Sequence, residues 1–433
     1  MKILYFRRRH ILRLCCEVIL QAAILFGILA ISNTVSWCAP SPQPGSPDFF
    51  ASPAHPTGWR GDGTGRFPEA TPVVSWSEEK KVRWSVKVGR AYSSPVLCSN
   101  TVLVTSEPNL LLCLSQATGQ ERWRLETRPQ DIPDEANRKA AEEYVPPKNG
   151  SGLAAATPAT DGQNIYFVFA NGIVRAVDCN GKPKWASVIG AEQSTAYGRS
   201  ASPILAEGKL IVHMTHLYAF DAATGKLLWS NTEAKSTYGT PASVRMGGTN
   251  YIITAAGDMV RVDDGTNVLS GLGQSQYASP VIGKNVVYFC DRVLKAVELS
   301  GNLTSKDLWE TELPGDVIGT PLWQNGLLFL ATGKGDLFVF DISGKEPEKP
   351  IIDARLLFGE QEGAVPIAYS SITLAGKFLF LASNKGEMAV MDATREARLQ
   401  SKNKLPVGTV SLPVFSGKNM FVRDGEKLYC IGE

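Results

Sequence analysis

The chain has 433 residues, of which 44% are apolar and 20% are charged, an ordinary globular composition with enough apolar side chains for a sizeable core. Its formal net charge of +2 is due to the N-terminal segment. A cut after residue 38 removes five of the 44 basic residues and one of the 42 acidic residues. The remaining 39 basic and 41 acidic residues give a net charge of about −2. This balance provides no basic stripe, so nucleic acid is excluded as a partner.

The first 38 residues have the layout of a secretory signal peptide. Met1–Arg13 is basic, an apolar run follows at Val18–Ile31, and Ser36 and Cys38 are small residues at positions −3 and −1 of the expected cut. The alternative is an uncleaved membrane anchor, although the apolar run is shorter than the roughly 20 residues that a comfortable span needs. We therefore expect export to the periplasm, the cell envelope or the extracellular space, with membrane attachment only if this segment stays on the chain.

Residues 39–75 are expected to form an extended, Pro/Gly-rich segment. Six prolines lie within Pro40–Pro56 with little apolar content between them, which is typical of a stiff linker. The segment Gly58–Gly63 follows with the sequence Gly-Trp-Arg-Gly-Asp-Gly. It contains the cell-adhesion tripeptide Arg-Gly-Asp, but a match of three residues arises by chance and predicts no adhesive function.

The rest of the chain repeats a hairpin signal. In its clearest copy, Ala219–Trp229, an alternating apolar run ends at Asp221, a Thr-Gly turn follows, and Trp229 lies in the return strand. Copies at Cys113–Trp123 and Ala176–Trp185 keep the turn and the Trp, whereas later copies decay until little beyond the acid remains. Each copy predicts a hairpin whose outer-strand Trp packs against a neighbouring copy.

A second signal counts the repeats. A Ser or Thr followed by Pro, or a relic of this pair, opens a short apolar strand eight times. These marker positions are Ser94, Thr157, Ser202, Thr240, Ser279, Thr320, Ser371 and Leu412. Their spacing suits four-stranded blades of about 40 to 45 residues.

The ends of the repeat region predict how the ring closes. The last repeat has only three strands, ending with Lys427–Ile431, and Lys81–Val88 is an unmatched fourth-strand sequence that contains Trp84. Pairing the two would remove the exposed sheet edges. We therefore predict an all-β fold, an eight-bladed β-propeller of four-stranded blades over residues 76–433.

Two intervals between the markers are long. Residues 127–150 include a stretch rich in Glu, Ala, Lys and Arg with Asp134 as a candidate N-cap, so we expect a short surface helix there. Residues 345–363 are charged and punctuated by Gly and Pro, so we expect a loop. Each insertion is either a solvated connection or an element that binds a partner or caps the channel.

The cysteines and histidines argue against metal or disulfide chemistry. Three of the eight cysteines lie in the first 38 residues, and the other five are widely spaced without a Cys-x-x-Cys pattern, which favours buried free thiols. These five are Cys98, Cys113, Cys179, Cys290 and Cys430. His213 and His216 alone are too few ligands for a metal site, so no metal is expected.

The residues three places before each Pro position are expected at the mouth of the central channel. Four of these eight residues are tyrosines, and two arginines lie in the same connections. The expected rim consists of Arg90, Tyr92, Arg199, Tyr238, Tyr277 and Tyr369. Tyrosine faces and arginine forks suit a peptide, a sugar or an anionic small molecule, and the alternative is that the tyrosines only fill the neck between blades.

The pattern Ala-x-Asp-x-x-Thr-Gly-x-x-x-Trp at 219–229 resembles the tryptophan-docking repeat of the quinoprotein-type, pyrroloquinoline-quinone-like β-propellers. This superfamily includes quinoprotein alcohol dehydrogenases and the non-enzymatic propeller lipoprotein of the outer-membrane β-barrel assembly machinery. The resemblance covers about residues 76–433. For the enzymes it implies a disulfide between adjacent cysteines beside the quinone, and calcium held by carboxylate and amide ligands with a catalytic Asp. The only adjacent pair here, Cys15 and Cys16, lies in the expected signal peptide, and no motif matches the calcium ligands.

We therefore predict an exported, non-catalytic propeller, expected as a monomer, that serves as a protein-binding or assembly scaffold in the cell envelope. The rim is expected to contact an envelope protein or peptide, and no catalytic residue, metal or cofactor is expected. The alternative is an enzyme or sensor that binds a carbohydrate, or pyrroloquinoline quinone with calcium, in the channel.

Overall fold

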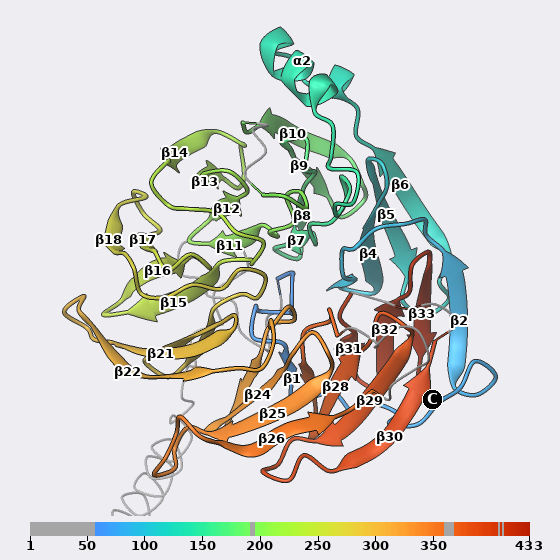
Figure 1. The fold of residues 1–433 in the computed structure, drawn as a ribbon. Coiled ribbons are helices and arrows are strands. Elements are labelled where there is room, and N and C mark those ends of the chain that lie inside the picture. The colour runs from blue at the N-terminus through green and yellow to red at the C-terminus, as the bar shows by residue number, and fades with distance from the viewer. Residues whose placement is uncertain (1–56, 191–194, 359–367, 406–407, 409–410) are drawn as a thin grey trace, which may run out of the picture. The chain divides into compact units, whose positions relative to one another are not determined.

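Eight sheets succeed one another around a central channel, and each sheet is one blade of a β-propeller (Figure 1). The computed structural model describes residues 57–190, 195–358, 368–405, 408 and 411–433, which all belong to one unit, Gln43–Glu433. The predicted all-β, eight-bladed fold is confirmed. The predicted signal peptide or anchor and the proline-rich linker lie outside the described residues, among which no helix is long and apolar enough to cross a membrane.

The first four blades share one order, in which strands that follow each other in the chain pair from the channel outward. Blade one consists of β3 (Val96–Cys98), β4 (Thr101–Ser106), β5 (Leu110–Ser115) and β6 (Glu121–Glu126). Blade two consists of β7 (Ala159–Thr160), β8 (Asn164–Val168), β9 (Ile173–Asp178) and β10 (Pro183–Val188). Blade three consists of β11 (Ile204–Ala206), β12 (Lys209–His213), β13 (Leu217–Asp221) and β14 (Leu227–Asn231). Blade four consists of β15 (Ala242–Met246), β16 (Thr249–Ile253), β17 (Met259–Arg261) and β18 (Asn267–Leu269).

The last four blades repeat this order, except that blade eight takes its outer strand from the N-terminal side of the propeller. Blade five consists of β19 (Val281–Gly283), β20 (Val286–Cys290), β21 (Val293–Leu299) and β22 (Ser305–Glu312). Blade six consists of β23 (Leu322–Gln324), β24 (Leu327–Ala331), β25 (Asp336–Asp341) and β26 (Pro350–Leu356). Blade seven consists of β27 (Thr373–Ala375), β28 (Phe378–Ala382), β29 (Glu387–Asp392) and β30 (Leu399–Lys404). Blade eight consists of β31 (Val414–Ser416), β32 (Asn419–Arg423), β33 (Lys427–Ile431) and β2 (Val82–Lys87).

The predicted closure of the ring is confirmed. β2 pairs antiparallel with β33, and Trp84 lies opposite Cys430 in this pairing. Blade eight therefore has the same four-stranded order as the other blades, although its strands come from both ends of the propeller. The pairing covers the edge of β33 that would otherwise present free backbone groups.

The repeated tryptophans join neighbouring blades. Trp185 of blade two donates its indole N–H to the carbonyl oxygen of Ala222 in blade three at 3.0 Å. Its ring also covers Gly225, where a Cβ atom would lie only 2.4 Å from the ring and where φ is +74°. Both the positive φ and the close ring therefore require glycine in this turn.

Three further tryptophans make the same contact with the next blade. The indole N–H groups and their backbone acceptors are Trp84 with Gln116 at 3.0 Å, Trp123 with Cys179 at 3.1 Å and Trp229 with Val262 at 3.0 Å. The prediction that each outer-strand Trp packs on a neighbouring copy is therefore confirmed where the repeat is well kept.

The Ser/Thr markers satisfy backbone N–H groups around the channel, which sequence reasoning did not foresee. At five of the eight markers, the N–H donates to the hydroxyl oxygen of the marker in the next blade. The pairs at 3.0 Å are Ser94 with Thr157, Thr157 with Ser202, Ser202 with Thr240, Ser279 with Thr320 and Thr320 with Ser371. Leu412 donates its N–H to Ser94 at 3.2 Å, which carries the pattern across the closure of the ring. Six of the marker hydroxyls thus accept a hydrogen bond from a buried N–H, whereas the Ser279 hydroxyl has no partner among the described residues and Leu412 has no hydroxyl.

The two insertions have different outcomes. The first contains a 3-10 turn, η1 (Pro129–Asp131), and the expected helix, α2 (Glu135–Glu143), whose N-cap Asp134 accepts a hydrogen bond from Asn137 N–H at 2.8 Å. The expectation of a loop at 345–363 is wrong in part, because β26 lies within it. This outer strand tolerates its initial proline and its charged side chains because one of its edges faces solvent. Residues 359–363 lie outside the described residues.

The boundary predicted at residue 76 is not a boundary in the structure. A short strand, β1 (Arg66–Phe67), pairs in parallel with β27 and adds a fifth strand to blade seven at the channel side. Phe67, Ala70 and Trp76 are buried in one core with side chains of blades seven, eight and one. Residues 57–75 therefore pack on the ring and are not part of a linker.

Candidate functional site

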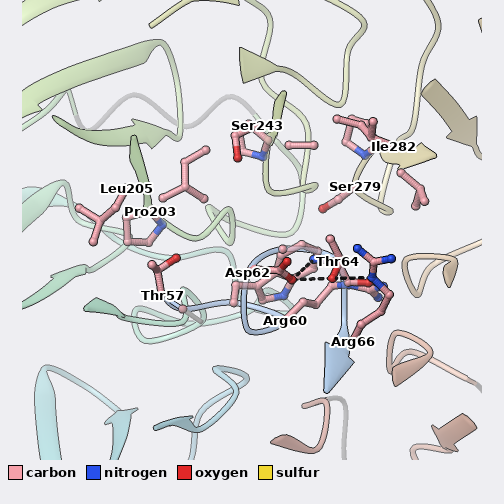
Figure 2. Close-up of a pocket in the computed structure, with 18 of the residues that line it drawn as sticks. Thr57, Arg60, Asp62, Thr64, Arg66, Pro203, Leu205, Ser243, Ser279 and Ile282 are labelled. Atoms are coloured by element: carbon pink, nitrogen blue, oxygen red, sulfur yellow. Dashed lines mark hydrogen bonds between the residues drawn. The ribbon is translucent and has the colours of Figure 1, made fainter. Parts of the chain in front are cut away.

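One end of the central channel is closed by the chain itself. The segment Thr57–Phe67, which we call the plug, binds inner strands of several blades. The N–H of Thr160 in blade two donates to the carbonyl of Thr57 at 2.7 Å, and the N–H of Leu374 in blade seven donates to that of Gly65 at 2.8 Å. Figure 2 shows the plug beside inner-strand residues of blades three to five.

Arg60 anchors the plug. Its guanidinium donates to the carbonyl oxygens of Thr320 at 3.0 Å and Pro321 at 2.9 Å in blade six, and to that of Thr64 at 2.9 Å. The side chain is 1% exposed, and this burial lowers its pKa to about 9. The Arg-Gly-Asp tripeptide is therefore not displayed on the surface, since its arginine holds the plug in place.

A small cavity lies between the plug and the inner strands of blades three to five (Figure 2). Its volume is about 70 Å³, and its polar lining includes Arg60, Asp62, Arg66, Ser243 and Ser279. A space of this size holds a few water molecules and excludes an organic ligand.

The opposite end of the channel opens into a cavity of about 1050 Å³. Five of the six expected rim residues line it, and these are Arg90, Tyr92, Tyr238, Tyr277 and Tyr369. Tyr92 is 49% exposed and Tyr369 is 38% exposed, so both present ring surface to solvent. Trp59 of the plug also lines the cavity. The channel is therefore a one-ended cavity with aromatic side chains at its mouth and an indole supplied by the plug.

Arg199 does not belong to the rim, and this part of the prediction is wrong. Its side chain is 2% exposed, and the guanidinium donates to the carbonyl oxygens of Ala170 at 2.9 Å and Gly190 at 2.6 Å. The sequence register places its backbone near the mouth beside Ser200, but the two carbonyls draw the side chain into the wall of blade two. Arg199 is a structural residue.

The tyrosines of blades three to five are neighbours at the mouth. The rings of Tyr238 and Tyr277 are stacked 5.4 Å apart with 14° between their planes, and the Tyr197 ring lies 5.9 Å from that of Tyr238 with 40° between their planes. The N–H of Tyr197 donates to the hydroxyl of Tyr238 at 2.9 Å. Burial, together with its tyrosine neighbours, raises the pKa of Tyr277, so its hydroxyl is a neutral hydrogen-bonding group at pH 7.

Tyr197 is a rim residue that sequence reasoning missed. It is 51% exposed and lines the cavity with the other tyrosines. It lies outside the register of three residues before the Pro position, because Ser200 occupies that place in its blade. Its carbonyl accepts the N–H of Ser151 at 2.8 Å, which joins the first insertion to the mouth. The sole sequence signal for Tyr197 is that it is an aromatic residue in the same inter-blade connection as Ser200.

The charged side chains of the cavity are one arginine, Arg90, and three acids. Glu107 accepts the N–H of Ala154 at 2.7 Å, Asp316 pairs with Arg292 at 2.5 Å, and Asp424 accepts the hydroxyl of Tyr429 at 2.7 Å. Burial raises the pKa of Glu107, and the hydrogen bond from Arg292 lowers that of Asp316. The acids thus have structural partners, and the lining favours a neutral or cationic group over an anion.

The channel does not fit the quinone and calcium that the sequence resemblance implies for the enzymes. Within the described part of the chain, no three His, Cys, Asp or Glu side chains gather as a metal site. The five cysteines there include no pair adjacent in sequence, which the enzymes' disulfide requires. A quinone with several carboxylates would also meet three acids and a single Arg90. No catalytic step is therefore derived for this cavity.

The fold and its docked tryptophans define a pyrroloquinoline-quinone-like β-propeller, as the sequence predicts. A family model described as outer membrane protein assembly factor BamB matches residues 69–213 and 213–346, which together are more than half of the chain. The chain belongs to this family. Among curated protein sequences, none matches it.

Solved structures share the fold at low sequence identity. BamB from Moraxella catarrhalis is 11% identical with a TM-score of 0.54, over 81% of this chain and 99% of that one. The computationally designed Ika8 protein is 13% identical with a TM-score of 0.54, over 80% and 99%. The quinohemoprotein alcohol dehydrogenase from Comamonas testosteroni is 13% identical with a TM-score of 0.55, over 87% and 80%. At these identities the likeness shows the fold alone, and the three proteins include an enzyme, an assembly factor and a design.

Proposed function

We propose that this protein is exported and acts as a non-catalytic, protein-binding scaffold in assembly of the cell envelope. Membership of the family described as outer membrane protein assembly factor BamB supports a role of this general kind. The lack of fit between the channel and a quinone with calcium supports a scaffold over a dehydrogenase.

The observation that carries the proposal is the tyrosine rim, which we define as Arg90, Tyr92, Tyr197, Tyr238, Tyr277 and Tyr369. These side chains gather at the one open end of a channel whose other end is plugged. Tyrosine and arginine dominate the energetics of protein interfaces, because they offer a large apolar surface with a polar tip at small entropic cost. We propose that the rim contacts a segment of an envelope protein.

The first insertion supports the same face as the contact surface. Its return segment, Asn149–Gly152, lines the cavity beside the rim, and Ser151 is hydrogen-bonded to Tyr197. The insertion and the rim therefore form one continuous surface that a partner can cover.

The proposal is tested by the double substitution Tyr92→Ala and Tyr369→Ala. Both side chains are exposed, so the fold should survive, and capture of the envelope partner should fall at least about tenfold, since alanine at an interface hot spot costs 2 kcal/mol or more. The matched control is Leu228→Ala with Leu399→Ala, which removes exposed side chains from outer strands. Unchanged capture by a rim variant with a wild-type melting temperature would contradict the proposal.

A neutral carbohydrate is the second candidate ligand. Trp59 and the rim tyrosines offer aromatic faces, and the marker and tyrosine hydroxyls offer hydrogen bonds to a neutral ligand. A saturable rise in melting temperature with a neutral oligosaccharide, absent with pyrroloquinoline quinone and Ca²⁺, would favour this candidate. No rise with either would leave the protein scaffold.

A further inference from the structure

Two cysteines face each other across the junction of blades one and two. Cys98 is the last residue of β3 in blade one, and Cys179 follows β9 in blade two. Their Sγ atoms are 3.6 Å apart. Cys179 also lies in the turn that docks Trp123, whose indole N–H it accepts at its carbonyl oxygen at 3.1 Å.

We propose that Cys98 and Cys179 form a disulfide bond between blades one and two, an inference that rests on the proposed export to an oxidising compartment. Both thiols lose their protons, and together they transfer two electrons to the disulfide of an oxidant, which is released as two thiols. The oxidant is an exported thiol oxidoreductase with a catalytic disulfide, or oxidised glutathione. Small exported domains use such bonds because their compartment maintains them.

The local geometry permits the bond with small movements. A disulfide needs the two sulfurs at about 2.05 Å, so they must approach by roughly 1.5 Å, which side-chain rotation at a strand end and a turn can provide. The present polar contacts of the sulfurs are weak: Thr160 donates its hydroxyl to Cys98 Sγ at 3.5 Å, and Cys179 donates its thiol to the carbonyl of Gly162 at 3.3 Å. No strand pairing has to break.

The difference in burial between the two sulfurs sets the order of the exchange. Cys98 is buried, whereas Cys179 is partly exposed. The Cys179 thiolate therefore attacks the disulfide of the oxidant first and forms a mixed disulfide with it. Cys98 then attacks Cys179 Sγ and releases the reduced oxidant. Burial and the neighbouring Cys98 raise the pKa of Cys179 to about 12, so the rate should rise as pH increases above neutrality.

The junction has a structural use for such a bond. The connection between β6 and β7 is the one that carries η1 and α2, so blades one and two are joined through a long insertion. A bond from Cys98 to Cys179 would tie the inner strand of blade one to the docking turn of blade two. The insertion could then bind a partner without loosening the ring.

The test uses the full chain in glutathione redox buffers, with alkylation of free thiols and mass spectrometry of the unreduced digest. We expect a peptide that links Cys98 to Cys179 in the wild type and in the control Cys290→Ser, and a melting temperature that falls when a reductant is added. Cys179→Ser should give no link and a melting temperature that the reductant does not change. Complete alkylation of both cysteines under oxidising buffer, or only a glutathione adduct on Cys179, would overturn the inference.

A second arm separates the bond from the proposed export. Thiols are trapped with acid and an alkylating reagent in cells that produce the chain. A Cys98–Cys179 link in the cells supports both proposals. A link that forms in the purified protein but is absent from the cells contradicts the export and leaves the geometry of the pair correct. Partner capture by the tyrosine rim does not depend on either arm.

Discussion

The two halves of the ring hold their blades together by different means. At the junctions from blade eight round to blade four, a tryptophan lies on the turn of the next blade and donates its indole N–H to backbone, as Trp185 does to Ala222. In the other half the equivalent position in blade four is Leu269, and β26 and β30 contain no tryptophan. Trp309 of blade five remains and stacks on Phe340 of blade six, with 6.4 Å between the ring centroids.

At the junction of blades seven and eight, the plug and the segment after it supply aromatic contacts in place of a docked tryptophan. Phe67 packs 5.6 Å from Phe415 of blade eight, and Trp76 stacks 6.5 Å from Phe380 of blade seven, both measured between ring centroids. Phe380 and Phe415 lie 4.9 Å apart across the junction. The comparison teaches that one kind of blade junction can be formed by a local repeat or by aromatic side chains brought from a distant part of the chain.

The largest expected effect is loss of the borrowed aromatic contact. Phe67→Ala removes a buried ring from the core of blades seven, eight and one, and should lower the free energy of unfolding by about 4 kcal/mol. Denaturant titration measures this loss. Leu399→Ala on the exposed outer strand of blade seven is the control and should change stability by less than about 0.5 kcal/mol. Equal effects of the two variants would show that the plug does not support this junction.

Low pH is expected to destabilise the half of the ring with docked tryptophans, because His213 in β12 is buried there. The ring is buried near the carbonyl of Ala234, and burial, more than the nearby His216, lowers its pKa from 6.5 to about 4. Between these two pH values the unfolded chain binds a proton that the folded protein does not. The stability from neutral His213 is therefore complete above pH 6.5 and falls by about 3 kcal/mol as the pH drops towards 4.

The variant His213→Gln isolates this effect, because the glutamine does not titrate. Its unfolding free energy should depend less on pH than that of the wild type between pH 6.5 and 4. Parallel pH curves for the two proteins would contradict a neutral, buried His213.

Alanine substitutions at two glycines test the contact between a docked tryptophan and the turn of the next blade. Gly225 and Gly271 have nearly equal φ angles of +74° and +73°, but a Cβ at Gly225 would strike the Trp185 ring, whereas one at Gly271 would meet nothing within 4 Å. Gly225→Ala should therefore destabilise the protein by about 2 kcal/mol more than Gly271→Ala, since both share the backbone strain and only the first is overpacked. Thermal melting of both variants gives the difference, and equal melting temperatures would contradict close packing of the Trp185 ring on Gly225.

The smallest effect is expected at the marker hydroxyls, which both halves share. Thr157→Val in one half leaves the N–H of Ser94 without its acceptor, and Thr320→Val in the other does the same to Ser279. Each substitution should cost about 1 to 2 kcal/mol, because the unsatisfied N–H groups are buried. Chemical denaturation should give similar losses for the two variants, and a loss in one half only would show that the marker hydroxyls do not stabilise both halves equally.

The parts of the fold that sequence could predict are those set by local spacing. The Asp-turn-Trp pattern and the Ser/Thr-Pro markers each lie within a few residues of the structure they specify, so blade number, ring closure and the Trp docks follow from them. The same register located Tyr92, Tyr238, Tyr277 and Tyr369 at the mouth, since the backbone of each blade enters the channel in the same way.

The parts that sequence could not predict depend on partners far along the chain. Arg199 turns away from the mouth because two carbonyls of blade two accept its guanidinium. Arg60 finds its acceptors in blade six, 260 and 261 residues later. The closeness of Cys98 and Cys179 exists only once blades one and two are assembled. Local composition and periodicity therefore do not predict any of these contacts.

The central claim, that the tyrosine rim binds an envelope protein, is tested most directly by a photo-crosslinking residue placed in the native protein in cells. Position Tyr369 lies at the open end of the channel, and position Leu399 lies on the exposed outer strand of the same blade. The account predicts a specific cross-link to an envelope protein from position Tyr369 and none from position Leu399. Cross-links to that protein from Leu399 but not from Tyr369 would contradict it.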